Sequence, residues 1–511
     1  MSRLAKTIKN AKVGLFFHVL FIASQFISRK IFLDGLGDEF MGIVSTLGSF
    51  LTFINLADLG IGTAIGYTLY KPLHKNDHKE INHIIQFFGH IYKKIGFFIL
   101  TGSILLSLFF PFIFNDVTIN LWLVYLTFFG LLTASLLGYF FNYHMILLQA
   151  DQKDYIVAKY YQSFNISKIL LQAISVYYLQ SFVLWISLEV LTGLIYTVFI
   201  RKKIAKEYPW LVLSTTVTKG ERKFESYTSL VTKIKQISIH KIGEFLASGL
   251  DNILIFFFLS AELVAYFANY QLVLVNLGTL VTKVFAGSKA SVGNLVAENN
   301  PQSIKQVFWE MMVLRYFIGG FGAINIFYLI NPFIGLWLGE KYTLSENTII
   351  IFAAIFFLRQ IVQPTEVFKQ AYGLYDDVWA PIVKSGINLT LSIILVQQLG
   401  ISGLLIGTFI SVLSIEGIWR PYYVYKRGFK NSHKQYLSGV IKLLLTFALN
   451  VIITIYILSL INLEPISFMQ WSLNALVVSL VSGIGFGFLL YISNSYCRDV
   501  IQRLRLSILK K

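Results

Sequence analysis

Long apolar stretches fill nearly all of this chain, and basic residues gather in every second gap between them. A helix needs about 20 mostly apolar residues to cross a bilayer, because it rises about 1.5 Å per residue. Only 14% of the residues are charged, whereas a soluble protein carries about 25%. The pattern therefore predicts an all-α polytopic membrane protein.

The number of spans follows from the apolar stretches and from the alternation of charge between them. Fourteen spans are favoured, and twelve is the alternative, because an even number keeps both basic ends of the chain on one side. The predicted spans are residues 12–33, 41–70, 95–114, 121–148, 158–179, 182–200, 237–259, 263–285, 307–337, 348–368, 378–396, 401–419, 440–461 and 471–493.

The basic residues also give the orientation, because they collect on the cytoplasmic side of a membrane. Basic clusters occur at the N-terminus, after the second, sixth and twelfth spans, and in the C-terminal tail. The opposite gaps are short and acidic or neutral, and Lys341 is their only clear basic residue. We expect both termini in the cytoplasm and the first apolar stretch retained as a helix. The net charge of +17 then lies beside anionic lipid headgroups and implies no nucleic-acid partner.

Short sequence matches recur at long spacing and indicate an internal repeat. Residues 76–81 resemble 299–304, and residues 149–155 resemble 370–377, at offsets of 223 and 221 positions. The matches predict two six-helix lobes related by a parallel repeat, which is a transporter architecture. The predicted parts are an N-terminal lobe at 11–200, a basic inter-lobe loop at 201–235, a C-terminal lobe at 236–424, two extra helices at 439–495 and a basic tail at 496–511.

Three motifs in the N-terminal lobe carry a resemblance to a known family: GLGDEFMG at 35–42, LADLGIG at 56–62 and LLQADQKDY at 147–155. They resemble the polysaccharide-transporter branch of the multidrug, oligosaccharidyl-lipid and polysaccharide (MOP) exporter superfamily. Lipid II flippases and drug/cation antiporters of the MATE type are other branches with the same pair of lobes. The resemblance implies a MATE-like fold, in which a V-shaped pair of helix bundles encloses a central cavity with alternating access.

The same resemblance implies a function and its partners. Members of that branch flip undecaprenyl-pyrophosphate-linked repeat units of O-antigen, capsule or related polysaccharides across the bacterial plasma membrane. The implied partners are the lipid-linked oligosaccharide, the membrane lipids, and the polymerase and glycosyltransferases of the same pathway.

Cations at membrane depth are the candidate substrate-binding residues. An ionisable side chain there costs several kcal/mol unless it is paired or faces a polar cavity. Pyrophosphate is anionic, and the guanidinium fork of arginine matches phosphate oxygens. The candidate cavity cations come from both lobes: Arg29, Lys168, Arg315 and Arg359. The alternatives are internal pairing, of Arg315 with Glu310 or of Lys168 with Glu189, and snorkelling of Arg29 and Lys30 to the outer headgroups.

Acidic residues give a second group of candidates. Glu244 and Asp251 are seven positions apart and therefore share one helix face. They are candidates for binding a coupling proton or sodium ion, or for pairing with the cavity cations. Asp58 lies beside Gly60 and Gly62, and we expect these three residues to serve helix packing and capping. The acidic turns at 151–154 and 376–377 are expected to be cytoplasmic capping elements, with gating as the alternative.

Enzyme and cofactor signals are absent from the sequence. It contains no Walker A motif, its histidines lack metal-ligand spacing, and Cys497 is the single cysteine, so no internal disulfide or cysteine metal site is expected. We therefore predict no catalytic residue, no metal and no cofactor. A cation-coupled antiporter of small compounds is the alternative, and it favours acids over bases at the midplane. A membrane-embedded glycosyl polymerase or ligase is the third hypothesis, against which the short external gaps count.

Overall fold

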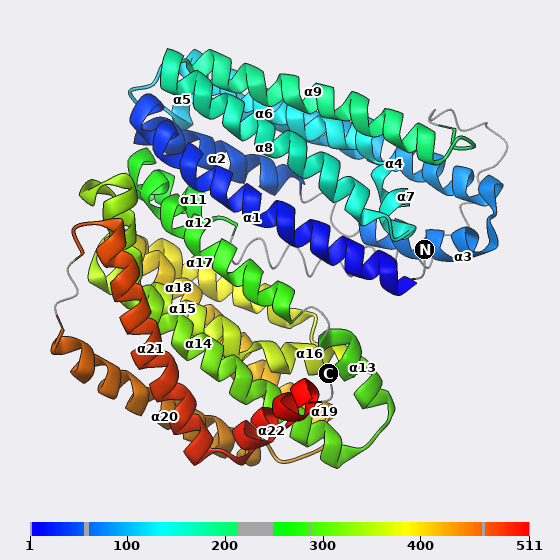
Figure 1. Cartoon of the computed structure of the whole chain (residues 1–511). Coiled ribbons are helices and arrows are strands. Elements are labelled where there is room, and N and C mark those ends of the chain that lie inside the picture. Colours follow the sequence, from blue (N-terminus) through cyan, green and yellow to red (C-terminus); the bar gives the residue numbers. More distant parts are fainter. Residues whose placement is uncertain (1–2, 56–60, 213–248, 286–287, 462–464, 510–511) are drawn as a thin grey trace. The chain divides into compact units, whose positions relative to one another are not determined.

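The computed structural model describes residues 3–55, 61–212, 249–285, 288–461 and 465–509, and all structural statements refer to these (Figure 1). These residues form helices joined by short connections, with no β-strand among them. Ten of the described helices are long and apolar enough to cross a membrane. The prediction of an all-α polytopic membrane protein is therefore confirmed.

The ten candidate spans coincide with ten of the predicted stretches. They are Val13–Leu36, Leu121–Asn142, Phe182–Glu207, Ala261–Val284, Pro301–Leu338, Glu346–Ala371, Trp379–Leu399, Ile401–Arg427, His433–Ser459 and Phe468–Ser493. Of the other four, stretch 41–70 is divided between two helices, 95–114 ends in a separate short helix, 158–179 is helical throughout, and 237–259 lies partly outside the described residues.

The described helices fall into two compact units, which are taken one at a time. Unit 1 comprises the described residues up to 212 together with 260–265. In it, α1 packs on α8, and α9 packs on both α6 and α8. Its helices are α1 (Arg3–Leu36), α2 (Asp38–Ile54), α3 (Ile61–Lys75), α4 (His78–Ser107), α5 (Phe110–Ile113), α6 (Leu121–Leu137) with a π-helical continuation (Gly138–Asn142), α7 (Met145–Ala150), α8 (Asp154–Leu179) and α9 (Phe182–Glu207).

Unit 2 comprises residues 249–259 and the described residues from 266 onward. In it, α14 packs on α15 and α21, and α17 packs on α18. Its helices are α11 (Asp251–Phe258), most of α12 (Ala261–Val284), α13 (Ser288–Ala297), α14 (Pro301–Leu338), α15 (Glu346–Ile361), α16 (Gln363–Ala371), α17 (Trp379–Leu399), α18 (Ile401–Val412) with a π-helical continuation (Leu413–Trp419), α19 (Arg420–Arg427), α20 (His433–Ser459), α21 (Phe468–Ser493) and α22 (Ser495–Leu509).

Turns at corresponding positions of the two units have similar backbone conformations. Asn76 and Asn299 both adopt a positive φ, of 54° and 53°, directly before the residue that caps α4 or α14. A positive φ is uncommon for residues other than glycine, and two further pairs share it, at offsets close to those of the sequence matches: Gln152 with Gly373 and Gln180 with Gly400. The corresponding caps are also alike, since the side chains of Asp77 and Asn300 accept backbone N–H groups in the first helical turn.

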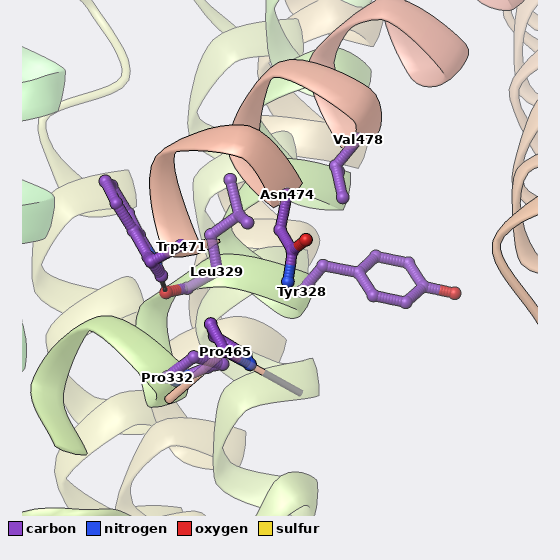
Figure 2. A pocket seen from close by; sticks show the side chains of 7 residues that line it. All are labelled: Tyr328, Leu329, Pro332, Pro465, Trp471, Asn474 and Val478. Carbon is purple, nitrogen blue, oxygen red and sulfur yellow. Dashed lines mark hydrogen bonds between the residues drawn. The ribbon is translucent and has the colours of Figure 1, made fainter. Parts of the chain in front are cut away.

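The last of the candidate spans, α21, is fixed to α14 by polar contacts. The indole Nε1 of Trp471 in α21 donates to the backbone oxygen of Leu329, 3.0 Å away and one turn before Pro332 (Figure 2). Asn325 of α14 donates to Ser482 Oγ at 3.3 Å and accepts from Ser479 Oγ at 2.8 Å. Hydrogen bonds of this kind hold helices together where apolar burial gives little net gain. The cavity beside Trp471 has a volume of about 10 Å³, which is room for about one water molecule.

Candidate functional site

Lys168 lies in α8 and is paired with an acid of the neighbouring helix. Its Nζ is 2.7 Å from Oε1 of Glu189 in α9, and Gln172 Nε2 donates to the other carboxylate oxygen at 3.1 Å. The structure therefore contains the internal pair that the sequence offered as the alternative for this residue. As long as the pair is intact, the positive charge of Lys168 is balanced within unit 1.

Arg315 lies in α14 and is balanced in a different way. Its side chain is only 5% exposed. Nη1 donates to Oε1 of Gln360 in α15 at 2.7 Å, and the guanidinium carbon lies 3.9 Å from the centre of the Phe285 ring. The Nε atom has no hydrogen-bond partner among the described residues.

The pairing of Arg315 with Glu310, which was the alternative to a cavity role, is not formed. Glu310 Oε2 instead lies 3.1 Å from Arg503 of α22. No acidic residue of the described part of the chain lies within 4.0 Å of the Arg315 guanidinium. This cation is thus buried against an amide and an aromatic ring.

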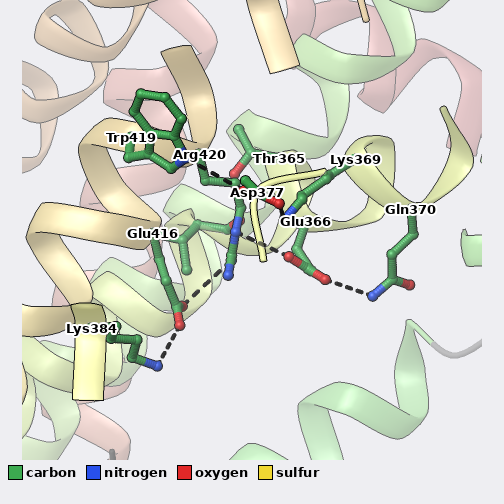
Figure 3. A network of polar contacts seen from close by, with 10 residues as sticks. Thr365, Glu366, Lys369, Gln370, Asp377, Lys384, Glu416, Trp419 and Arg420 are labelled. Carbon is green, nitrogen blue, oxygen red and sulfur yellow. Dashed lines mark hydrogen bonds and ion pairs between the residues drawn. The ribbon is translucent and has the colours of Figure 1, made fainter. Parts of the chain in front are cut away.

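Arg359 is exposed in the last turn of α15 and belongs to a charged region of unit 2. It interacts electrostatically with Asp251, the first residue of α11, and with Glu416 in the π-helical segment after α18. Glu416 in turn is 2.6 Å from Lys384 of α17 and 3.5 Å from Arg420 (Figure 3). Asp251 was predicted either to bind a coupling ion or to pair with a cavity cation, and Arg359 is a cation with which it interacts.

Of the remaining predicted site residues, some lie within the described part of the chain and others lie outside it. Arg29 is half-buried in α1, with Nη1 2.5 Å from the sulfur of Met41. Lys30 is exposed and lies 3.7 Å from Asp34. Gly62 stands in the first turn of α3. Asp58, Gly60 and Glu244 lie outside the described residues.

Sequence reasoning missed several charges that join the region around Glu416. Lys384 is a single charge within the apolar stretch 378–396, and that isolation was the signal that marked it. Arg420 Nε also lies 3.0 Å from Glu366 of α16. Nothing in the sequence connected these residues, because they come from three different helices.

Unit 2 also contains a long apolar groove of about 510 Å³ between α14, α15, α18 and α20. Exposed lining residues show that it opens on the surface of the unit: Ile350, Leu444 and Ile455. Two buried hydroxyls in its lining, of Tyr316 and Thr454, have no hydrogen-bond partner among the described residues. Because Tyr316 follows Arg315 directly on α14, the groove and the buried cation occupy adjoining faces of one helix.

The described residues contain no group of three His, Cys, Asp or Glu side chains that could hold a metal ion. No described side chains therefore assemble a metal centre beside the groove or the buried cation.

Solved transporters share the architecture of this chain. A structure described as the lipid II flippase MurJ in an inward closed conformation aligns with a TM-score of 0.66 and 16% identity, covering 97% of this chain and 100% of that one. An inward-facing multidrug resistance MATE family transporter of the MOP superfamily aligns with a TM-score of 0.62 and 14% identity, covering 81% and 98%. An outward-facing structure of the same description gives 0.55 and 14%, covering 82% and 97%.

No protein-family model and no curated protein sequence matches the chain. At these identities the likeness concerns the fold, since one fold serves many substrates. The chain is a multi-pass membrane protein with the MATE-like fold of these transporters and flippases.

Proposed function

We propose that this protein is a flippase for lipid-linked oligosaccharides. It moves undecaprenyl-pyrophosphate-linked repeat units across the bacterial plasma (inner) membrane by alternating access, for the synthesis of O-antigen, capsule or exopolysaccharide, with both termini in the cytoplasm. The observation that carries the proposal is the apolar groove of unit 2, one wall of which is formed by the added helix α20.

The groove suits a long hydrocarbon chain. Its lining is aliphatic and aromatic on all four helices, for example Ile324 of α14, Phe357 of α15, Phe409 of α18 and Val451 of α20. Burying apolar surface yields about 25 cal/mol per Å², and a polyprenyl chain presents apolar surface along its whole length. A small polar compound would gain little from such a lining.

The extent of the two structural matches supports the same choice. The flippase alignment covers 97% of this chain, whereas the multidrug transporter alignment covers 81%. The more complete match to the flippase therefore favours a lipid-linked substrate over a small compound.

The buried cation supplies a partner for the pyrophosphate. Arg315 has a free Nε donor and no acidic partner among the described residues, so phosphate oxygens would complete its hydrogen bonds. Charge-assisted bonds of this kind are about twice as strong as neutral ones. In this proposal Arg315 and Arg359 bind the pyrophosphate, together with Arg29 and with Lys168 once Glu189 releases it.

The alternative is a cation-coupled antiporter of small compounds. The match to the multidrug transporters favours it. Such a protein needs a carboxylate that binds a coupling ion, and Asp251, which also interacts electrostatically with Arg359, is the described candidate for that role.

The test fills the groove and compares neighbouring positions on α20. Leu444→Trp and Val451→Trp place an indole in the groove, whereas Leu445→Trp and Ile452→Trp place it on outer positions that are each 65% exposed. We expect the groove variants to lose flipping of a fluorescent polyprenyl-pyrophosphate oligosaccharide in proteoliposomes while the outer variants keep it. Normal flipping by both groove variants at normal abundance would exclude the groove as the lipid site. Export of cationic dyes with no activity toward the lipid would favour the antiporter.

A further inference from the structure

In unit 1 the loop between α7 and α8 is fastened to the end of α9. Lys153 Nζ lies 2.8 Å from Asp151 Oδ2 and 2.9 Å from Glu207 Oε1. Tyr208 donates its hydroxyl to Asp151 Oδ2 at 2.9 Å, and Lys153 lies 4.8 Å from the centre of the Tyr208 ring. We name this group of four residues, Asp151, Lys153, Glu207 and Tyr208, the unit 1 clasp.

In unit 2 the matching connection is fastened in a similar way (Figure 3). Lys369, in the last turn of α16, has its Nζ 2.6 Å from Asp377 Oδ1, in the loop before α17. Trp419, at the end of the π-helical segment after α18, directs its indole Nε1 toward Asp377 Oδ2 at 3.4 Å. We name these three residues, Lys369, Asp377 and Trp419, the unit 2 clasp.

The two clasps occupy corresponding places but use different residue orders. Each loop contains one of the matched left-handed residues, Gln152 with φ 58° or Gly373 with φ 65°. The lysine follows the aspartate by two positions in unit 1 and precedes it by eight in unit 2. Since the residues do not align, the feature common to both units is the contact between the loop and the helix end.

The clasps differ in their access to water. In unit 1 the side chains of Lys153, Asp151 and Glu207 are 20%, 26% and 24% exposed. In unit 2 those of Lys369 and Asp377 are 10% and 2% exposed. Salt screens exposed charges and hardly reaches buried ones, and a partly exposed pair is weaker than a buried one. Removing one member of a buried pair leaves an uncompensated charge, which is strongly unfavourable.

The unit 1 clasp also lies beside residues 210–212 of the predicted inter-lobe stretch 201–235, the first seven residues of which belong to α9. Asn82 of α4 donates to the backbone oxygen of Trp210 at 3.1 Å and accepts from the N–H of Val212 at 2.7 Å. The ring of His78 stacks on Trp210 at 4.1 Å. Release of Tyr208 would therefore loosen the attachment of residues 210–212 to α4.

The unit 1 clasp contains one cation and two carboxylates, and Glu207 also lies 3.2 Å from Lys203. Burial alone would lower the pKa of Lys153, but its bonds to Asp151 and Glu207 outweigh burial and raise that pKa above its usual value. The lysine thus stays charged at neutral pH. What opens the clasp is competition by ions or water rather than deprotonation.

We propose that the two clasps form a matched pair of conformational elements, of which the unit 1 clasp opens and closes during transport while the unit 2 clasp stays closed. Opening frees the loop between α7 and α8 from the end of α9 and from Tyr208. The closed unit 2 clasp keeps α16, α17 and the segment carrying Glu416 together as one body. The proposal does not depend on which substrate is carried.

Hydrogen exchange of the full-length protein in lipid nanodiscs tests it. Exchange at residues 149–154 should rise about threefold between 50 mM and 500 mM NaCl, because salt screens ion pairs that are partly exposed to water. Exchange at residues 370–378 should not change with salt. Equal responses of the two loops to salt would overturn the difference between the clasps.

Matched variants test the contacts themselves. Lys153→Met should raise exchange at 149–154 about threefold or more at low salt and remove its salt dependence, whereas Lys159→Met, at an exposed position in α8, should change nothing. If Lys153→Met and Lys159→Met show the same hydrogen exchange at residues 149–154, the unit 1 clasp does not hold the loop between α7 and α8.

In unit 2, Lys369→Met should raise exchange at 370–378 about 100-fold, with Lys305→Met as the exposed control. Should Lys369→Met fail to fold, Trp419→Phe removes only the indole hydrogen bond and should raise exchange there about two- to tenfold. Unchanged exchange in Trp419→Phe would show that this connection is not closed by the clasp.

Discussion

Lys168 in unit 1 and Arg315 in unit 2 are both cations within long apolar helices, yet their surroundings differ. Lys168 is 2.7 Å from the carboxylate of Glu189, whereas Arg315 bonds to the neutral amide of Gln360 and stacks on Phe285. A cation beside a carboxylate is already balanced, and its role is structural until the pair separates. A cation beside an amide keeps its net charge, and in the proposed function this charge binds the anionic substrate.

The largest effect is expected from removing the unbalanced cation. Arg315→Ala should lower flipping of the lipid-linked substrate about 100-fold, since hydrogen bonds to charged groups contribute about 1.5–3 kcal/mol. Arg315→Lys should keep part of the activity, because it retains the charge and loses the fork. The measurement is flipping in proteoliposomes at matched protein abundance. Normal activity of the alanine variant would assign Arg315 a packing role.

An acidic residue placed beside Arg315 should give it surroundings like those of Lys168, which is paired with Glu189. Gln360→Glu places an acid at the position now 2.7 Å from Nη1 and should lower flipping about tenfold, because the substrate then competes with an internal partner. Thermal stability should stay the same or rise, since a buried charge gains a partner. An accompanying drop in stability would indicate that the guanidinium is balanced by a group outside the described residues.

Replacing the acid beside Lys168 by an amide should give Lys168 surroundings like those of Arg315. Glu189→Gln leaves Lys168 without its carboxylate and should lower stability by about 2 kcal/mol, less than the 3–5 kcal/mol typical of fully buried pairs, because both side chains keep some exposure. The double variant Lys168→Gln/Glu189→Gln should recover most of that loss and flip normally if the pair is structural. Loss of flipping in the stable double variant would place Lys168 among the substrate ligands.

Sequence patterns were sufficient to predict features that depend on residues near one another in the chain. Apolar length identified the helices, and the matches at 76–81 and 149–155 fall where the two units turn with the same left-handed residues, such as Asn76 and Asn299. Lys168 and Glu189 could be paired in advance because they lie in consecutive spans. Contacts between distant segments could not be predicted, as the alternative partner considered for Arg315 shows: Glu310 is close in sequence, but it pairs with Arg503.

The groove could not be predicted for a related reason. A leucine on α20 has the same hydropathy whether it faces lipid, a neighbouring helix or a cavity. Leu444 and Leu445 are adjacent and identical in type, but only Leu444 lines the groove. Packing of four helices decides between them, and one sequence carries no direct record of that packing.

The smallest effect is expected at the contact that fixes α21 to α14. Trp471→Phe keeps the ring and removes the hydrogen bond from Nε1 to the oxygen of Leu329, which should lower stability by about 1 kcal/mol. Flipping should be unchanged, because this contact lies beside a cavity of about 10 Å³, far too small for a substrate. Thermal unfolding and proteoliposome flipping, measured on the same preparation, separate these two effects. A loss of flipping without a loss of stability would mean that the position of α21 bears on transport, and that the comparison of Lys168 with Arg315 omits a third element.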